Sequence, residues 1–287
     1  MEPSVAELID QIRPLFRRLR DRYQTALPAQ PSDHGFRFAG SQQRFRHACE
    51  ELGTIEVLKR LAPELRSFLN VGANAGYYCL LAEALGLEAM GFEPEQAAFR
   101  LLQRNLSLND SSCLAIPAAV AASRGRASFY GTGTAGSLLE GLSGTPRWDH
   151  RSVITIPLDA LFAKGGITEG PTDSLWLLDC EGAEPDALQG AQLLLRATHP
   201  LLVLELAPER NRQAWLQCLD DLRLLTYSHL LACSSLVEGP ARWRPLTADA
   251  IDDCAFHDNV LVVAEAHHQV FLSRLPSGSS INQNCHE

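Results

Sequence analysis

From Ser67 onward the chain alternates short apolar runs with longer stretches in which apolar residues recur every three or four positions. Short apolar runs are typical of buried strands, and the longer pattern is typical of helices. Strands are expected at residues 67–71, 87–92, 113–120, 126–130, 153–156, 174–178, 201–206, 227–233 and 259–264. Helices are expected at residues 76–85, 95–108, 184–196 and 210–225. This alternation predicts an α/β domain with a parallel sheet between two layers of helices.

The two ends of the chain differ from this central pattern. No helix separates the last two strands, so they are expected to form an antiparallel pair at an edge. Residues 5–26 and 41–61 have helical spacing, with a pause at Gly53–Thr54. The stretch 131–150 is rich in Gly, Ser and Thr and is expected to be a loop.

These patterns divide the chain into three parts. The expected parts are an N-terminal helical cap at 1–64, the α/β domain at 65–266 and a flexible tail at 267–287.

Composition narrows the classes of protein. A formal net charge of −9 argues against nucleic acid as the main partner. No apolar run approaches the ~18 residues of a membrane span, and no apolar signal core opens the chain, so a cytoplasmic location is expected. None of the eight cysteines forms a Cys-x-x-Cys pair, so neither a zinc site nor a redox motif is indicated.

A glycine-containing turn follows the first expected strand of the domain, as Asn70-Val-Gly-Ala-Asn-Ala-Gly76. A dinucleotide loop has the form Gly-x-Gly-x-x-Gly, but Asn74 occupies its second glycine position and Tyr77 its third. The turn therefore suits a nucleoside ligand that has no pyrophosphate to bind. Glu93 ends the second strand, 21 residues after Gly72, where a carboxylate can accept hydrogen bonds from both ribose hydroxyls.

An ordered set of short motifs resembles the FkbM family of methyltransferases over about residues 67–264. The motifs are Asn70–Gly76, Gly91–Pro94, Asn105 with Asn109, Ala118–Ala119 with Gly125, Leu158–Leu161, Leu178–Glu184, Leu188–Gly190, His199–Pro200 with Glu205, and Asp258–Val260. No single motif is specific, but their succession is.

The resemblance implies a class I methyltransferase fold, which is a Rossmann-like, seven-stranded, mostly parallel sheet with helices on both faces. It also implies S-adenosyl-L-methionine as the cofactor and a hydroxyl of a sugar, polysaccharide or polyketide as the methyl acceptor. The positions that match the family's cofactor site are Asn70, Gly72, Ala73, Asn74, Gly76, Glu93, Pro94, Ala118, Ala119 and Asp179. Asp179 and Glu181 match the acidic strand end that faces the reacting methyl group.

The chain departs from the family pattern at two positions. The family usually has Asp where this chain has Asn70, and often has Lys where it has Leu177. Asn70 keeps the ability to hydrogen-bond without the charge, whereas Leu177 removes a possible charge partner.

Methyl transfer to an alcohol requires a group that takes the hydroxyl proton. Asp179, Glu181 and Glu184 follow one strand end, and neighbouring carboxylates suit a general base because each disfavours the charge of the others. Glu184 alternatively begins the next helix, where the helix dipole favours an acid. His150 and His257 remain alternative bases. No metal is assigned, although Asp179 and Glu205 offer ligands that suit a divalent cation.

The sequence leaves two alternatives to an active methyltransferase. A catalytically silent methyltransferase-like domain would bind a partner through the arginine-rich N-terminal helix, and the departures at Asn70 and Leu177 favour it. A nicotinamide oxidoreductase is disfavoured by Asn74 and Tyr77. The identity of the acceptor and the oligomeric state are not indicated by the sequence.

Overall fold

The structure is a computed structural model, and it describes residues 26–40, 52–131, 136–140, 150–162, 173–208, 211–232, 243–252, 258–267 and 274. The helix expected at 5–26, the first part of the helix expected at 41–61, and most of 131–150 and of the tail lie outside the described residues.

The main sheet has eight strands in the order β12-β11-β13-β10-β9-β3-β4-β5. Their bounds are β3 Ser67–Val71, β4 Glu88–Phe92, β5 Leu114–Ile116, β9 Ser174–Leu178, β10 Leu201–Leu206, β11 Tyr227–Ala232, β12 Trp243–Pro245 and β13 Asp258–Ala264. The strands from β5 to β10 pair in parallel, whereas β13, β11 and β12 pair antiparallel. The expected Rossmann-like α/β fold is present, but the sheet is mixed and eight-stranded rather than seven-stranded and mostly parallel.

Two features of the C-terminal strands explain this difference. Strand β12 has only three residues, too few to show an alternating pattern in the sequence. The pair β11–β13 is antiparallel as expected, but it is not the edge of the sheet, because β12 pairs with the outer side of β11. Strand β13 itself lies between β10 and β11. Val260 and Val262 pack into the core on one face of the sheet, and Leu261 and Val263 into the core on the other. A strand that is buried on both faces belongs inside a sheet.

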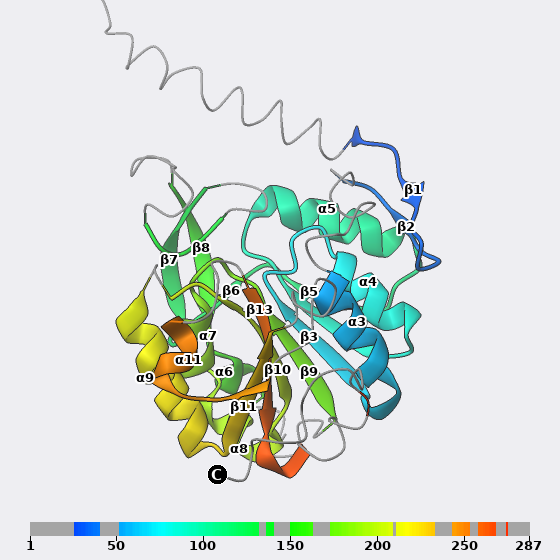
Figure 1. Cartoon of the computed structure of the whole chain (residues 1–287). Helices are drawn as coiled ribbons and strands as arrows, with labels where there is room; N and C mark the ends of the chain where they lie inside the picture. Colours follow the sequence, from blue (N-terminus) through cyan, green and yellow to red (C-terminus); the bar gives the residue numbers. More distant parts are fainter. Residues whose placement is uncertain are drawn as a thin grey trace, which may run out of the picture.

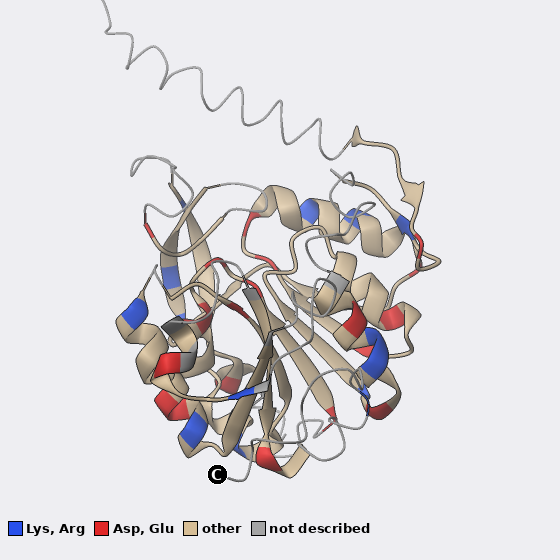
Figure 2. Cartoon of the chain, viewed as in Figure 1, with Lys and Arg blue, Asp and Glu red and all other residues tan. Residues whose placement is uncertain are grey.

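Helices cover both faces of the sheet (Figure 1). One layer contains α3 Leu52–Leu61, α4 Tyr77–Ala84 and α5 Gln96–Ser107; the other contains α6 Leu158–Phe162, α7 Glu184–Gln189, α8 Gln192–Thr198, α9 Arg212–Leu224 and α11 Ala248–Asp252. The alternation along β9 produces both cores, since Leu175 and Leu177 face the first layer while Trp176 and Leu178 face the second. Charged residues gather on the helices and at strand ends (Figure 2).

Three expected elements differ in their bounds. The strand expected at 113–120 divides at Pro117 into β5 and β6 Ala119–Val120, because proline has no N–H for the ladder. The helix expected at 184–196 divides at Gly190, where a Cβ would overlap the carbonyl oxygen of Ala121. Helix α3 begins at Leu52 and includes Gly53 and Thr54, so the described helix begins before the expected N-cap at Thr54, which is buried.

Two smaller sheets complete the described fold. Strand β8 His150–Ile156 lies between β6 and β7 Gly125–Tyr130, and this three-stranded sheet stands beside the carboxyl ends of the main strands (Figure 1). Strands β1 Gln30–Pro31 and β2 Arg37–Phe38 form an N-terminal hairpin that the sequence did not indicate. Within the described part of the chain, no helix combines the length and apolar character needed to cross a membrane.

Candidate functional site

The turn between β3 and α4 is fixed to the end of the neighbouring strand β4. Gly72 and Ala73 donate their backbone N–H groups to the carbonyl oxygen of Phe92, at 3.0 and 2.8 Å. Gly76 donates its N–H to the carbonyl oxygen of Ala73 at 2.8 Å, which closes the turn before α4 begins. The residues predicted as the cofactor loop therefore form one compact turn at the carboxyl end of the sheet.

This turn needs left-handed backbone at three positions. The φ angles of Gly72, Asn74 and Gly76 are 86°, 47° and 87°. A Cβ on Gly72 would overlap the carbonyl oxygen of Asp179, so only glycine lets the turn pack against the end of β9. Asn74 tolerates the left-handed region better than most residues with a side chain. Because position 72 is a glycine, the loop can lie in contact with the acidic end of β9.

Glu93 is a buried carboxylate that holds the loop. Its Oε2 accepts the N–H of Asn74 at 2.8 Å and its Oε1 accepts the N–H of Glu95 at 2.7 Å; the intervening Pro94 has no N–H to offer. Burial raises the pKa of Glu93 to about 8, and the hydrogen bond from Asn74 opposes that rise. Each carboxylate oxygen has two acceptor positions, so Glu93 can hold the loop and still accept hydroxyl donors.

Asn70, at the start of the predicted loop motif, lies within β3. It is buried on β3 towards α4, and its Nδ2 lies 3.9 Å from the Sγ of Cys79. Among the described residues, no group hydrogen-bonds to its Oδ1. Ala118 and Ala119 are buried where the chain passes from β5 to β6, beside the Ile116 carbonyl that accepts the N–H of Glu93.

The acidic strand end forms a second tight turn, Asp179 to Gly182. The N–H of Asp179 bonds to the carbonyl oxygen of Val71 at 3.0 Å, which continues the β3–β9 pairing by one residue. Glu181 then has a φ of 57° and Gly182 a φ of 93°, so two consecutive residues are left-handed. A left-handed glutamate costs roughly 1–2 kcal/mol, and strain of this kind is often retained at functional sites.

Two side chains support this strained turn by hydrogen bonds to its backbone. Glu184, fully buried at the start of α7, accepts the N–H of Cys180 at 2.7 Å and that of Gly182 at 3.3 Å through Oε1. Ser137, also buried, donates its hydroxyl to the carbonyl oxygen of Glu181 at 2.8 Å. Glu184 thus begins the helix that follows the acidic strand end, which is the alternative role expected for it, and it also accepts hydrogen bonds from the turn before that helix. Burial raises the pKa of Glu184 to about 7, and the charge of Asp179 adds to the rise.

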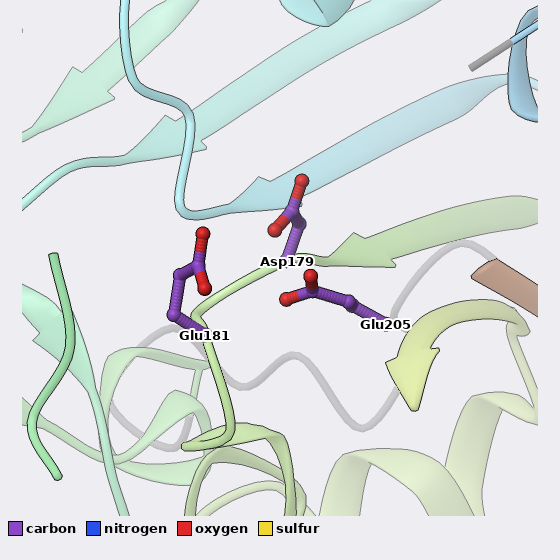
Figure 3. Close-up of side chains that lie close together, drawn as sticks. All are labelled: Asp179, Glu181 and Glu205. Atoms are coloured by element: carbon purple, nitrogen blue, oxygen red, sulfur yellow. The ribbon is translucent and has the colours of Figure 1, made fainter. Parts of the chain in front are cut away.

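Asp179, Glu181 and Glu205 bring their carboxylates together (Figure 3). One oxygen from each of the three side chains lies within 4.8 Å of the other two. Glu205 is 6% exposed and comes from β10, where the pairing of Leu204 with Leu178 places it level with Asp179. Carboxylate oxygens can accept a proton, and they are also the ligands that divalent cations prefer. The cluster therefore suits either a proton acceptor or a cation.

Sequence reasoning missed two residues of this arrangement as site residues. Glu205 entered only as a motif member and as an alternative metal ligand, yet a single acid within the buried run Leu201–Leu206 was a signal. Ser137 had no sequence signal, since it lies in a stretch expected to be a loop. Of the alternative bases, His150 is exposed at the start of β8 beside Tyr130, and His257 lies outside the described residues.

Comparison with solved structures gives distant matches. A methyltransferase FkbM from Methylobacillus flagellatus KT is 17% identical, with a TM-score of 0.43, over 89% of this chain and 59% of that one. A putative O-methyltransferase from Klebsiella pneumoniae is 13% identical, with a TM-score of 0.41, over 90% of this chain and 94% of that one. A tRNA (uracil-54, C5)-methyltransferase from Pyrococcus abyssi, in complex with S-adenosyl-L-homocysteine, is 11% identical, with a TM-score of 0.41, over 82% and 43%.

The chain thus spans about three fifths of the Methylobacillus protein and under half of the Pyrococcus protein. A search of curated proteins finds no match. The family model described as "Methyltransferase FkbM domain" matches residues 70–234, which is more than half of the chain and includes the turn, Glu93 and the acidic cluster. This match confirms the resemblance found in the motifs and agrees with S-adenosylmethionine as the expected cofactor. The chain belongs to the FkbM methyltransferase family.

Proposed function

We propose that the protein transfers the methyl group of S-adenosylmethionine to a hydroxyl group of a sugar, polysaccharide or secondary metabolite. The observation that carries the proposal is the convergence of Asp179, Glu181 and Glu205 directly beside the glycine turn. In parallel α/β sheets, ligands bind at the carboxyl ends of the strands, and all of these residues lie there. Membership of the FkbM family supplies the reaction class.

The residues of the two turns suit this cofactor. A ribose diol offers two O–H donors, and Glu93 is a buried acceptor at the end of β4. Ala118 and Ala119, which match the adenine side of the family's site, are small residues beside that strand end. Asp179 and Glu181 provide negative charge for a cation such as a sulfonium. When bound, the cofactor supplies an electrophilic methyl group, which is chemistry that no side chain of the protein has.

The carboxylates would then act on the acceptor. Asp179 follows a rigid strand, and its N–H bond to Val71 fixes its backbone. We assign it as the group that takes the hydroxyl proton, because a carboxylate held in place at a strand end can act as a positioned general base. Glu181 and Glu205 add negative charge beside Asp179. Glu184 and Ser137 hydrogen-bond to the backbone of the turn and keep Glu181 in place.

Methyl transfer from labelled S-adenosylmethionine to a panel of sugars, polysaccharides and polyketide alcohols tests the proposal. The purified protein should bind S-adenosylhomocysteine at micromolar levels, about −8 kcal/mol, should not bind NAD, and should label at least one hydroxyl compound. Binding of S-adenosylhomocysteine with no transfer to any acceptor class would favour the silent, partner-binding domain instead. Tight NAD binding would contradict the assignment of the loop.

A further inference from the structure

The N-terminal hairpin β1–β2 is bound to the methyltransferase domain by asparagine side chains of α5 and of the turn that follows it. Asn105 accepts the N–H of Ala39 at 2.8 Å through Oδ1 and donates to the carbonyl oxygen of Ala39 at 2.8 Å through Nδ2. Asn109, one helical turn later, does the same with the N–H and carbonyl oxygen of Arg37, both at 2.7 Å. Two asparagine amides therefore pair with the end of the hairpin as a neighbouring strand would.

Asn105 makes one further bond that Asn109 does not. Its Nδ2 also donates to the carbonyl oxygen of Ala75 at 2.9 Å. Ala75 lies in the turn between β3 and α4, Gly72 to Gly76, which we call the cofactor turn. Asn105 has no exposed surface, so these bonds lie in a dry environment where losing them is costly. One side chain thus holds the hairpin and the cofactor turn together.

The cofactor turn is consequently held at two adjacent residues, Asn74 and Ala75. Glu93 accepts the N–H of Asn74, and Asn105 donates to the carbonyl oxygen of Ala75. Asn74 is left-handed, with a φ of 47°, so the turn is strained and depends on such external bonds to keep one conformation. Glu93 is the proposed ribose acceptor, so the loop geometry that Asn105 fixes is the geometry that presents this carboxylate.

Aromatic packing also joins the hairpin to the residue that directly follows the cofactor turn. The ring of Tyr77, the first residue of α4 after the cofactor turn, packs edge-on against Phe36 at 5.4 Å and Phe38 at 5.6 Å between ring centroids. Figure 1 shows β1 and β2 beside α5, near the end of α4. The hairpin lies outside residues 70–234, the part of the chain that the family model matches.

We infer that the N-terminal hairpin is part of the cofactor site and that Asn105 is the positioning residue that links the two. The inference rests on the proposed cofactor. Docking of the hairpin through Asn105 holds the Ala75 carbonyl, and this fixes the turn that the cofactor contacts. Binding free energies are reciprocal, so a hairpin that strengthens cofactor binding must itself be stabilised by the cofactor to the same extent.

The experiment compares Asn105→Ala with the matched control Asn109→Ala in the full chain, using S-adenosylhomocysteine as the probe. Calorimetry measures the dissociation constant, and hydrogen exchange measures the amides of Arg37 and Ala39 with and without the probe. In the wild-type protein the probe should slow the exchange of both amides. Each variant is judged at the amide whose own acceptor it keeps. Asn105→Ala should bind the probe about tenfold more weakly and lose the protection of the Arg37 amide, which Asn109 still accepts. Asn109→Ala should bind within about threefold of wild type and keep the protection of the Ala39 amide, which Asn105 still accepts.

The wild-type measurement keeps the inference testable even if Asn105→Ala fails to fold. Unchanged exchange at Arg37 and Ala39 on saturation with the probe would overturn it, because the two sites would then be energetically independent. Equal loss of affinity in both variants would overturn the specific role of Asn105. A wild-type protein that does not bind the probe at all would overturn the proposed function together with the inference.

Discussion

Asn70 on β3 and Leu177 on β9 are register partners in neighbouring parallel strands, and both are buried. Their side chains therefore lie side by side on the α4 face of the sheet. The resemblance to the FkbM family expects Asp at the first position and often Lys at the second. The two departures thus fall on one pair of contacting positions. Replacing an acid and a base together leaves no unpaired buried charge, so we interpret them as one coupled change.

This interpretation predicts the result of a double-mutant cycle. Asn70→Asp and Leu177→Lys should each destabilise the protein by roughly 3–5 kcal/mol, because each buries a charge with no partner. The double variant should lose clearly less than the sum of the two, with a coupling of at least about 1 kcal/mol. Urea unfolding of the four proteins measures this. Additive losses would show that the two departures are independent.

The strain at Glu181 predicts opposite effects on stability and turnover. Glu181→Gly relieves a left-handed glutamate and removes one of three crowded carboxylates, so the free energy of unfolding should rise by about 1 kcal/mol. Turnover should fall at least tenfold. Glu181→Gln is the control, since it removes the charge and keeps the strain. A glycine variant that gains stability and retains full turnover would leave Glu181 with no role in the reaction.

Asp179→Asn distinguishes a proton acceptor from a metal ligand. The amide keeps an oxygen that a divalent cation can bind but cannot take a hydroxyl proton. As the base, Asp179 should lose roughly two to four orders of magnitude in turnover on this change, with a smaller effect on cofactor affinity. We expect no recovery on raising Mg²⁺ from micromolar to millimolar levels. Recovery by Mg²⁺, together with loss of wild-type activity in a chelator, would identify Asp179, Glu181 and Glu205 as a metal site.

The buried carboxyl of Glu93 predicts a pH dependence of stability. Its pKa is raised from 4.5 to about 8, so the folded protein holds a proton that the unfolded chain releases between these values. The free energy of unfolding should therefore fall as the pH rises through this window, by up to about 1.4 kcal/mol per pH unit. Below pH 4.5 both states are protonated and the contribution is complete.

Glu93→Gln should flatten this dependence, and the control Glu88→Gln, at the exposed opposite end of β4, should not. Denaturant unfolding of the cofactor-free protein at several pH values measures both slopes. Identical slopes in wild type and Glu93→Gln would mean that Glu93 ionises as it does in the unfolded chain.

Local elements were predictable where the signal lay within a few residues. The run Ser174–Leu178 gave its strand with the right bounds, since five consecutive buried residues end at an acidic turn. The glycine turn and Glu93 were located for the same reason, because a tight turn at a strand end needs particular residues at fixed spacing. The division of a helix at Gly190 was harder, because contact with Ala121 decides it. The division of a strand at Pro117 had a local signal in the proline, but only the tertiary structure shows that β5 and β6 belong to different sheets.

The sequence by itself determined the family, the alternation of strands and helices, and which residues end each strand at the cofactor side. Only the tertiary structure decided which of those ends meet. The register of β10 against β9 sets Glu205 beside Asp179, and the insertion of β13 sets Asn259 opposite Glu205. Likewise, only the docked hairpin reveals that Asn105 bonds to residues 66 positions before it and 30 positions before it. The spacing of apolar residues shows which face of a single helix or strand is buried. Strand register and the docking of the hairpin depend on packing between elements that are distant in the chain, so that spacing does not predict them.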